Sequence, residues 1–250
     1  MIKETDRKIV RSFRVRFAQV DGAHVIYYPR YLEMIADTFP EAALDRVPYD
    51  LSIRFLGSNR LGDNIKMIFE SNETGWSVSG SMKRESFSIV LTEKSADRPV
   101  EPYQSELASF ETDQFTIRDW MCGPDGALHL SRYYELISHA VEQWFEASLE
   151  MSFRDLHVAE NLGIPTVQLD TRCRAFPRSG DTVSVALRPI SVGESAAQLM
   201  TWLTGSGGVL LETRQVIVFA DLSDRKIQSV RIPDTLKRNM RSQLAAVPSH

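Results

Sequence analysis

The chain has 250 residues, of which 43% are hydrophobic and 25% are charged, and its formal net charge is -4. These values are ordinary for a globular protein and argue against a nucleic-acid-binding protein, which usually carries a basic surface. No run of about 18 apolar residues occurs, so no membrane-spanning helix is expected. The charged N-terminus lacks the apolar core of a secretory signal, and only two cysteines occur. We therefore expect a cytoplasmic protein without a zinc site built on cysteine pairs.

The first half of the sequence predicts one helix followed by a run of strands. Residues 11–20 alternate as a strand does, and residues 29–45 carry apolar side chains at helical spacing. Pro29 suits the first turn of this helix, and Pro40 is expected to break or kink it. β-branched and aromatic residues then gather in four strand-like segments, at 49–57, 64–71, 76–83 and 86–93. The stretch 94–106, with two prolines and mixed charges, is the best candidate for a linker.

The second half repeats this order of elements. A strand is predicted at 114–119, before a Gly/Pro-rich loop at 122–127 and a long helix at about 130–150 with an apolar stripe. Four strands are then predicted, at about 165–176, 181–192, 195–204 and 208–221. The polar tail 233–250 predicts a short, frayed helix. One helix and then a run of strands, twice over, predicts an α+β fold in which an antiparallel sheet wraps around each helix.

A short motif links the two halves. Residues 30–35 (RYLEMI) recur as residues 132–137 (RYYELI), an offset of 102 residues. The repeat indicates two related units, which we place at residues 1–100 and 108–250. Glu33 and Glu135 lie one turn into the predicted helices, where an acidic side chain suits the positive end of the helix dipole.

The residues before the first copy of this motif resemble the hotdog-fold thioesterases of the 4-hydroxybenzoyl-CoA thioesterase type. That family shows a D-x-x-G loop, an apolar pair and P-x-Y at the start of its central helix, and here residues 21–31 read DGAHVIYYPRY. The ten-residue spacing from Asp21 to Tyr31 is also that of the family. In the second half, residues 163–167 (GIPTV), 176–183 (FPRSGDTV) and 215–221 match the fold. The resemblance implies a double hotdog, in which two units imitate the dimer of single-hotdog enzymes.

The same resemblance implies hydrolysis of an acyl-CoA thioester. Cleavage of a thioester needs a nucleophile or general base at the carbonyl carbon and donors for the oxyanion that forms. Asp21 would be this carboxylate, and the backbone N–H of Tyr28, at the helix N-terminus, would be the oxyanion donor. Tyr27 and Pro29 would line the substrate site. Basic residues near strand edges could bind the coenzyme A phosphates, in particular Arg172, Arg174 and Arg178. No metal or redox cofactor is implied.

Two departures from the family pattern leave alternatives open. The glycine of the D-x-x-G loop is His24 here, which is either a loop residue held at a conformational cost or a second acid/base group. In the second copy the position that matches Asp21 is Gly123, so one active site per chain is expected. An alternative alignment of the two copies, with two residues deleted from the loop, makes Asp125 and His129 a D-x-x-x-H pair. This pair resembles the acid and histidine in the second hotdog of acyl-ACP thioesterases. Turn chemistry alone also explains Asp125.

Three functions are therefore weighed. The first is an acyl-CoA thioesterase, and the second is an acyl-ACP thioesterase or a hotdog dehydratase or acyl-transfer enzyme. The third is a non-catalytic acyl-CoA-binding protein, since one fold hosts many functions. The expected partner is an acyl-CoA or an acyl-ACP, with no nucleic acid and no membrane. The chain is expected to be a monomeric pseudo-dimer or a homo-oligomer of it.

Overall fold

The computed structural model describes residues 7–22, 24–39, 49–82, 84–93, 103, 108–221 and 228–244. The expected linker at 94–106 lies outside the described residues, except for Tyr103. The first predicted helix is α1 (Arg30–Thr38), and residues 40–45 of the prediction also lie outside the described part.

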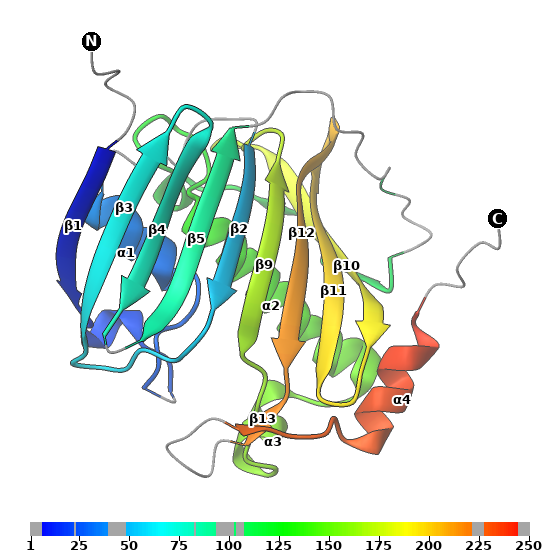
Figure 1. Cartoon of the computed structure of the whole chain (residues 1–250). Coiled ribbons are helices and arrows are strands. Elements are labelled where there is room, and N and C mark those ends of the chain that lie inside the picture. Colours follow the sequence, from blue (N-terminus) through cyan, green and yellow to red (C-terminus); the bar gives the residue numbers. More distant parts are fainter. Residues whose placement is uncertain are drawn as a thin grey trace.

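Each half of the chain contributes a contiguous block of strands to one large sheet (Figure 1). The first block contains β1 (Arg7–Arg14), β2 (Tyr49–Phe55), β3 (Asn64–Asn72), β4 (Gly75–Ser81) and β5 (Glu85–Glu93). The second block contains β6 (Phe110–Glu111), β7 (Phe115–Thr116), β9 (Thr166–Cys173), β10 (Thr182–Val192), β11 (Ala196–Gly205) and β12 (Gly208–Val218). The strand order is β1-β3-β4-β5-β2-β9-β12-β11-β10-β6, and β7 pairs with β10.

The two blocks meet where β2 pairs with β9. This pairing is antiparallel and runs from Tyr49 opposite Cys173 to Arg54 opposite Gln168. Helices α1 and α2 (Leu130–Leu149) lie on the same face of the joined sheet (Figure 1). The arrangement confirms the predicted α+β double hotdog, in which the sheets of the two units join edge to edge. The domain boundaries themselves stay a prediction.

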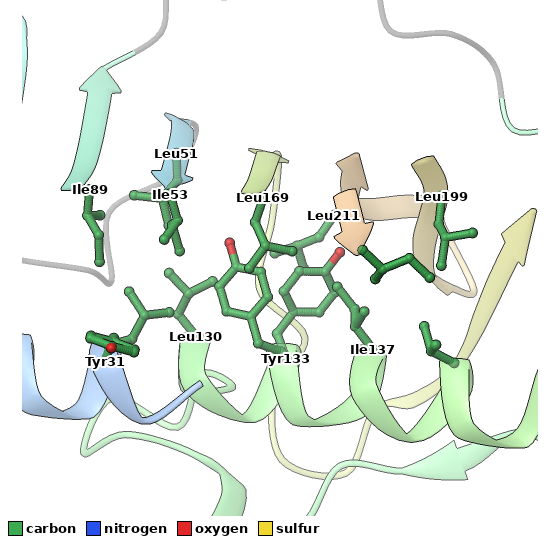
Figure 2. Packing of buried hydrophobic residues seen from close by; sticks show 14 of the residues in the cluster. Tyr31, Leu51, Ile53, Ile89, Leu130, Tyr133, Ile137, Leu169, Leu199 and Leu211 are labelled. Atoms are coloured by element: carbon green, nitrogen blue, oxygen red, sulfur yellow. The ribbon is translucent and has the colours of Figure 1, made fainter. Parts of the chain in front are cut away.

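The hydrophobic core lies between these two helices and the sheet. In β4 every second residue is buried, as expected for a strand with one face on a core. Figure 2 shows α2 pointing its apolar side chains toward the strands above it. Labelled there are Tyr31 of α1, Leu130, Tyr133 and Ile137 of α2, and Leu51, Ile53, Ile89, Leu169, Leu199 and Leu211 of the sheet. All ten are at most 3% exposed, and each aliphatic side chain so buried contributes about 1.5–3 kcal/mol.

The strands predicted at the start of the two units, at 11–20 and 114–119, end earlier than predicted, and a 3-10 turn follows each of them. β1 ends at Arg14 and a 3-10 turn at Phe17–Gln19 replaces the rest of the predicted strand 11–20. The Gln19 side chain accepts the Arg16 N–H at 2.7 Å, and the Gln19 N–H donates to the Arg16 carbonyl at 3.1 Å. These local bonds compete with strand pairing. In the second unit, β7 is followed in the same way by a 3-10 turn at Asp119–Met121.

The C-terminal tail also differs from the prediction, because its helix is docked and not frayed. α4 (Asp234–Ser242) buries Leu236 and Met240, and Gln243 after it accepts a hydrogen bond from the Trp144 indole at 2.8 Å. Four short elements were not predicted, namely β6, α3 (Phe153–Val158), β8 (Leu162–Gly163) and β14 (Gln228–Ser229). β8 and β14 pair with β13 (Ala220–Asp221), the end of the predicted strand 208–221, in a separate three-stranded sheet. Within the described part of the chain, no helix is long and apolar enough to cross a membrane.

Candidate active site

The loop before α1 is a tight turn around Asp21. The Asp21 N–H donates to the Val25 carbonyl at 2.9 Å, and the Asp21 carbonyl accepts the His24 N–H at 3.0 Å. One carboxylate oxygen of Asp21 also accepts the Val25 N–H, at 3.3 Å. The Asp21 side chain is nevertheless exposed. The turn therefore holds the Asp21 backbone while its carboxylate faces solvent.

His24 occupies the left-handed region of backbone conformation, with φ of 59°. This region favours glycine, because a Cβ atom there is crowded against the backbone. The matching residue of the second unit is Gly126, with φ of 78°. The turn therefore requires a positive φ at this position, and His24 meets the requirement at some conformational cost. Its side chain is exposed.

The loop before α2 repeats the first loop at an offset of 102 residues. The Gly123 N–H donates to the Ala127 carbonyl at 2.9 Å, and the Gly126 N–H donates to the Gly123 carbonyl at 2.9 Å. These are the bonds that Asp21 and its neighbours make in the first unit. The structure thus adopts the ungapped register, which matches Asp21 with Gly123.

The alternative pair, Asp125 and His129, is not matched to the Asp21 loop in this register. Asp125 is exposed, and its carboxylate accepts the Ala127 N–H at 3.1 Å, as in an ordinary Asx turn. His129 falls on the position of Tyr27 and caps α2. Its Nδ1 accepts the Ser131 N–H at 3.3 Å and lies 2.8 Å from the Ser131 hydroxyl. Burial lowers the pKa of His129, so the ring is neutral near pH 7.

Tyr28 and Pro29 begin α1 of the first unit. Among the residues that the structure describes, the Tyr28 N–H has no hydrogen-bond acceptor. Leu130 is at the matching position of the second unit, and its N–H likewise has no acceptor among the described residues. A helix N-terminus carries a partial positive charge, so each N–H can stabilise an oxygen anion. Of these two N–H groups, only that of Tyr28 follows a loop with an aspartate at the position of Asp21, because the second loop has Gly123 there.

The tyrosine rings before α1 lie against the second unit. The Tyr28 hydroxyl donates to the Tyr134 carbonyl of α2 at 3.0 Å, and the two rings meet edge to face with centroids 6.2 Å apart. The Tyr27 ring packs edge to face on Tyr28 at 5.5 Å. Burial raises the pKa of both phenols, and the nearby Ser138 side chain of α2 opposes this rise in each case. Both phenols are therefore neutral over the whole physiological range.

Four charged residues of the repeated motif join the two helices. Arg30 pairs with Glu33 at 2.6 Å and with Glu135 of the other unit at 3.1 Å. Arg132 pairs with Glu135 at 2.7 Å and with Glu33 of the other unit at 3.6 Å. The Ser131 hydroxyl also donates to Glu33, at 3.3 Å. The acids were expected to support their own helices, and the structure shows that they also pair across the two units.

The three arginines predicted to bind phosphate do not lie together. Arg172 of β9 pairs with Glu212 at 3.1 Å and with Asp50 at 3.5 Å. Since Thr171 beside it points toward α2, Arg172 lies on the opposite face of the sheet. Arg174 is exposed after the end of β9. Arg178 is also exposed, and its guanidinium donates to the Asp125 carbonyl at 2.9 Å. Only Arg178 is shown in contact with a loop that precedes a helix.

Sequence reasoning missed the residues that the second unit contributes beside Tyr28. Ser138 and Tyr134 lie within the predicted helix, but helical spacing indicates only that they share a face. The echo RYLEMI and RYYELI includes the arginines and acids of the charged cluster. This repeated motif would have predicted ion pairs between the units only together with the expectation that the two helix N-termini lie close to each other.

Comparisons with known proteins agree with this architecture. Residues 118–240 match the family model described as the thioesterase-like superfamily. A protein assigned as an oleoyl thioesterase from Lactobacillus plantarum superposes with a TM-score of 0.62 at 10% identity, over 86% of this chain and 97% of that chain. The 12:0-ACP thioesterase from Umbellularia californica superposes with a TM-score of 0.63 at 9% identity, over 85% of this chain and 94% of that chain.

A shorter structure, a thioesterase superfamily protein from Jannaschia sp. CCS1, superposes with a TM-score of 0.52 at 16% identity, over 59% of this chain and 100% of that chain. No curated protein matches the sequence. At these identities the superpositions establish the fold, and the family model establishes the kinship of the second half. The expected double-hotdog fold is thereby confirmed, and residues 118–240, in its second unit, match the thioesterase-like superfamily.

Proposed function

We propose that this protein hydrolyses an acyl-CoA thioester at the loop before α1. The observation that carries the proposal is the exposed Asp21 carboxylate in the loop that precedes the Tyr28 N–H, a helix N-terminal donor with no acceptor in the described structure. A carboxylate and an oxyanion donor are the two groups that thioester hydrolysis requires.

The proposed reaction uses these groups in order. The thioester carbonyl oxygen accepts a hydrogen bond from the Tyr28 N–H. Asp21 either attacks the carbonyl carbon or removes a proton from an attacking water. The tetrahedral oxyanion then collapses, the carbon–sulfur bond breaks, and the thiolate takes up a proton to leave as the free thiol. In the attack route, water hydrolyses the resulting anhydride and restores Asp21.

We assign one such site to each chain. Gly123 stands where the second unit would need the aspartate, so the loop before Leu130 has no carboxylate at the position of Asp21. The second unit instead contributes the helix against which Tyr27 and Tyr28 pack. Tyr27 and Pro29 are proposed to border the substrate, and Arg174 and Arg178 are exposed enough to meet coenzyme A phosphates. The cytoplasmic location and the pseudo-dimeric monomer or its homo-oligomer stay predictions.

The acyl carrier is the first property to test. A panel of acyl-CoA thioesters with short, medium, long and aryl acyl groups should give free thiol at a rate that depends on enzyme concentration. The same acyl groups on acyl carrier protein should react more slowly. Faster reaction of the acyl-ACP substrates would favour the second candidate, an acyl-ACP thioesterase with chemistry at His129. Measurable binding of acyl-CoA with no thiol release across the panel would favour a non-catalytic binder.

Asp21→Asn tests the catalytic carboxylate. The amide oxygen can still accept the Val25 N–H, so the turn is kept while the base or nucleophile is lost. We expect kcat to fall by about 10²–10⁴-fold, the usual contribution of such a group. The matched control is Asp125→Asn, which makes the same change in the other loop and should leave kcat within about threefold. Near-normal turnover of the Asp21 variant would contradict the assignment, and loss of turnover in the Asp125 variant would move the chemistry to the second loop.

A further inference from the structure

The side chain of Tyr28 extends from the first unit onto a single turn of α2 in the second. Its hydroxyl donates to the Tyr134 carbonyl at 3.0 Å. The side chain of Ser138, four residues further along α2, also acts on this phenol, because it opposes the rise in its pKa that burial causes. In a regular helix the Tyr134 carbonyl also accepts the Ser138 N–H, so both contacts of the phenol fall on one helical turn.

The phenol of Tyr28 is held at its proton and at its ring. The Tyr28 proton goes to the Tyr134 carbonyl, and the nearby Ser138 side chain opposes the rise in the pKa of the phenol that burial causes. Burial raises the pKa of the phenol well above its usual value, so the proton stays in place at every physiological pH. The ring is held as well, between Tyr27 at 5.5 Å and Phe55 of β2 at 6.4 Å.

The second unit shows no comparable arrangement. At the offset of 102 residues, Leu130 replaces Tyr28, Leu32 replaces Tyr134 and Ala36 replaces Ser138. Leu130 has no hydroxyl to donate to the opposite helix, and Ala36 has no hydroxyl to match that of Ser138. The unit that carries Asp21 is therefore also the unit in which the residue with the oxyanion donor is anchored on its neighbour by its own side chain. In the unit with Gly123, the apolar side chain of Leu130 provides no such anchor.

We propose that Tyr28 and Ser138 are positioning residues, which fix the Tyr28 peptide N–H where the thioester oxyanion develops. Because the phenol and the N–H belong to the same residue, anchoring the ring on α2 restricts the backbone torsions of Tyr28. The second unit thereby completes the site of the first without contributing a group that reacts. This inference rests on the proposed thioester hydrolysis.

A positioning role has a distinct kinetic signature. An oxyanion donor acts in the transition state, so its displacement lowers kcat and leaves KM nearly unchanged. A misplacement of about 1 Å can cost about 10²-fold in rate, and loosening of the anchor is expected to cost less than that. A phenol that only contacted bound substrate would instead change KM.

The test uses the full-length protein with the best thioester of the acyl-CoA panel. Tyr28→Phe and Ser138→Ala each remove one hydroxyl and should lower kcat by about tenfold with KM within about twofold. Ser138→Thr keeps the hydroxyl and should restore most of the rate. The double variant should fall no further than Tyr28→Phe alone, because the two hydroxyls act as one unit. The matched control is Ser148→Ala, on the same helix at its other end, which should behave as the wild type.

The outcomes separate this inference from the function on which it rests. If the wild type hydrolyses a thioester and both Tyr28→Phe and Ser138→Ala keep its kcat, the positioning role is wrong and the proposed thioesterase function still stands. A rise in KM at constant kcat, or losses that multiply in the double variant, would also overturn it. A wild type that releases no thiol from any thioester would overturn both. Melting temperatures of the variants, compared with that of Ser148→Ala, show whether a loss of rate reflects unfolding.

Discussion

His24 illustrates how a single residue can satisfy a turn without taking part in chemistry. Its φ of 59° is the conformation that the turn before α1 requires, and its counterpart Gly126 meets the same requirement without a side chain. The left-handed conformation costs about 1–2 kcal/mol for a residue with a Cβ atom. His24 is exposed, and its hydrogen bonds to the rest of the described structure are made by its backbone. We therefore expect His24 to be a loop residue rather than a second acid/base group.

His24→Gly tests this expectation. Relief of the backbone strain is offset by the larger entropy loss of glycine on folding, about 0.5–1 kcal/mol. The free energy of unfolding should therefore stay within about 1 kcal/mol of the wild-type value, and kcat should stay within about threefold. Urea unfolding and the thiol-release assay measure the two quantities. A loss of kcat of more than about 10²-fold in the folded variant would show that the imidazole acts as an acid or base.

At the scale of elements, the N-termini of α1 and α2 meet in a set of shared polar contacts. His129 caps α2, Ser131 lies between His129 and Glu33, and Arg30 and Arg132 pair with Glu33. Desolvation is the largest influence on the pKa of His129 and lowers it. Glu33, Asp37 and Glu135 favour the charged ring, whereas Arg132 disfavours it. Burial outweighs the acids, and Arg132 adds to its effect by disfavouring the charged ring.

This balance predicts a pH dependence of stability. The unfolded chain protonates His129 near pH 6.5, whereas the native state resists protonation until a lower pH. Between these two values the unfolded state binds more protons, so stability falls as the pH decreases. Above about pH 6.5 the effect is absent.

His129→Asn isolates this contribution, because asparagine also caps helices well but does not titrate. The free energy of unfolding of the wild type should decrease more than that of the variant when the pH is lowered from about 7.5 to about 5. Denaturant titrations at several pH values measure the difference. Parallel pH profiles for the two proteins would contradict the prediction.

At the scale of the whole molecule, the two units share one large sheet and place their central helices on the same face of it. β2 and β9 pair from Tyr49–Cys173 to Arg54–Gln168, and Ser52 donates to Asp170 across this junction at 2.7 Å. The charged cluster and the Tyr28 hydroxyl join the helices above the same junction. Neither unit can unfold without exposing a buried strand edge and breaking these contacts.

We therefore expect the two units to unfold together. Differential scanning calorimetry should give a single transition whose calorimetric enthalpy equals the van't Hoff enthalpy. Far-ultraviolet circular dichroism and tryptophan fluorescence should give coincident transitions. Two resolved transitions would show that the units are separate cooperative domains.

The sequence by itself determined the local features of this protein. Periodicity predicted α2 and most strands of the sheet, since a pattern over about ten residues reports which face of an element is buried. The spacing from Asp21 to Tyr31 predicted the turn and helix start at the candidate site. The echo at 102 residues predicted two units, and the loss of the aspartate at Gly123 predicted that they are not equivalent. The 3-10 turns at Phe17–Gln19 and Asp119–Met121 escaped this reasoning because apolar alternation does not report local side-chain bonds.

The tertiary structure decided which distant residues meet. Tyr28 and Tyr134 are 106 positions apart, and Ser131 and Glu33 are 98 apart, so no local pattern reports their contacts. The same holds for Arg172, whose pairing with Asp50 and Glu212 depends on the order of strands in the sheet. Side-chain periodicity specifies that a face is buried, but the partner on that face is chosen by packing between whole elements. For this reason Asp21 could be found in the sequence, whereas Ser138 beside Tyr28 could be found only in the fold.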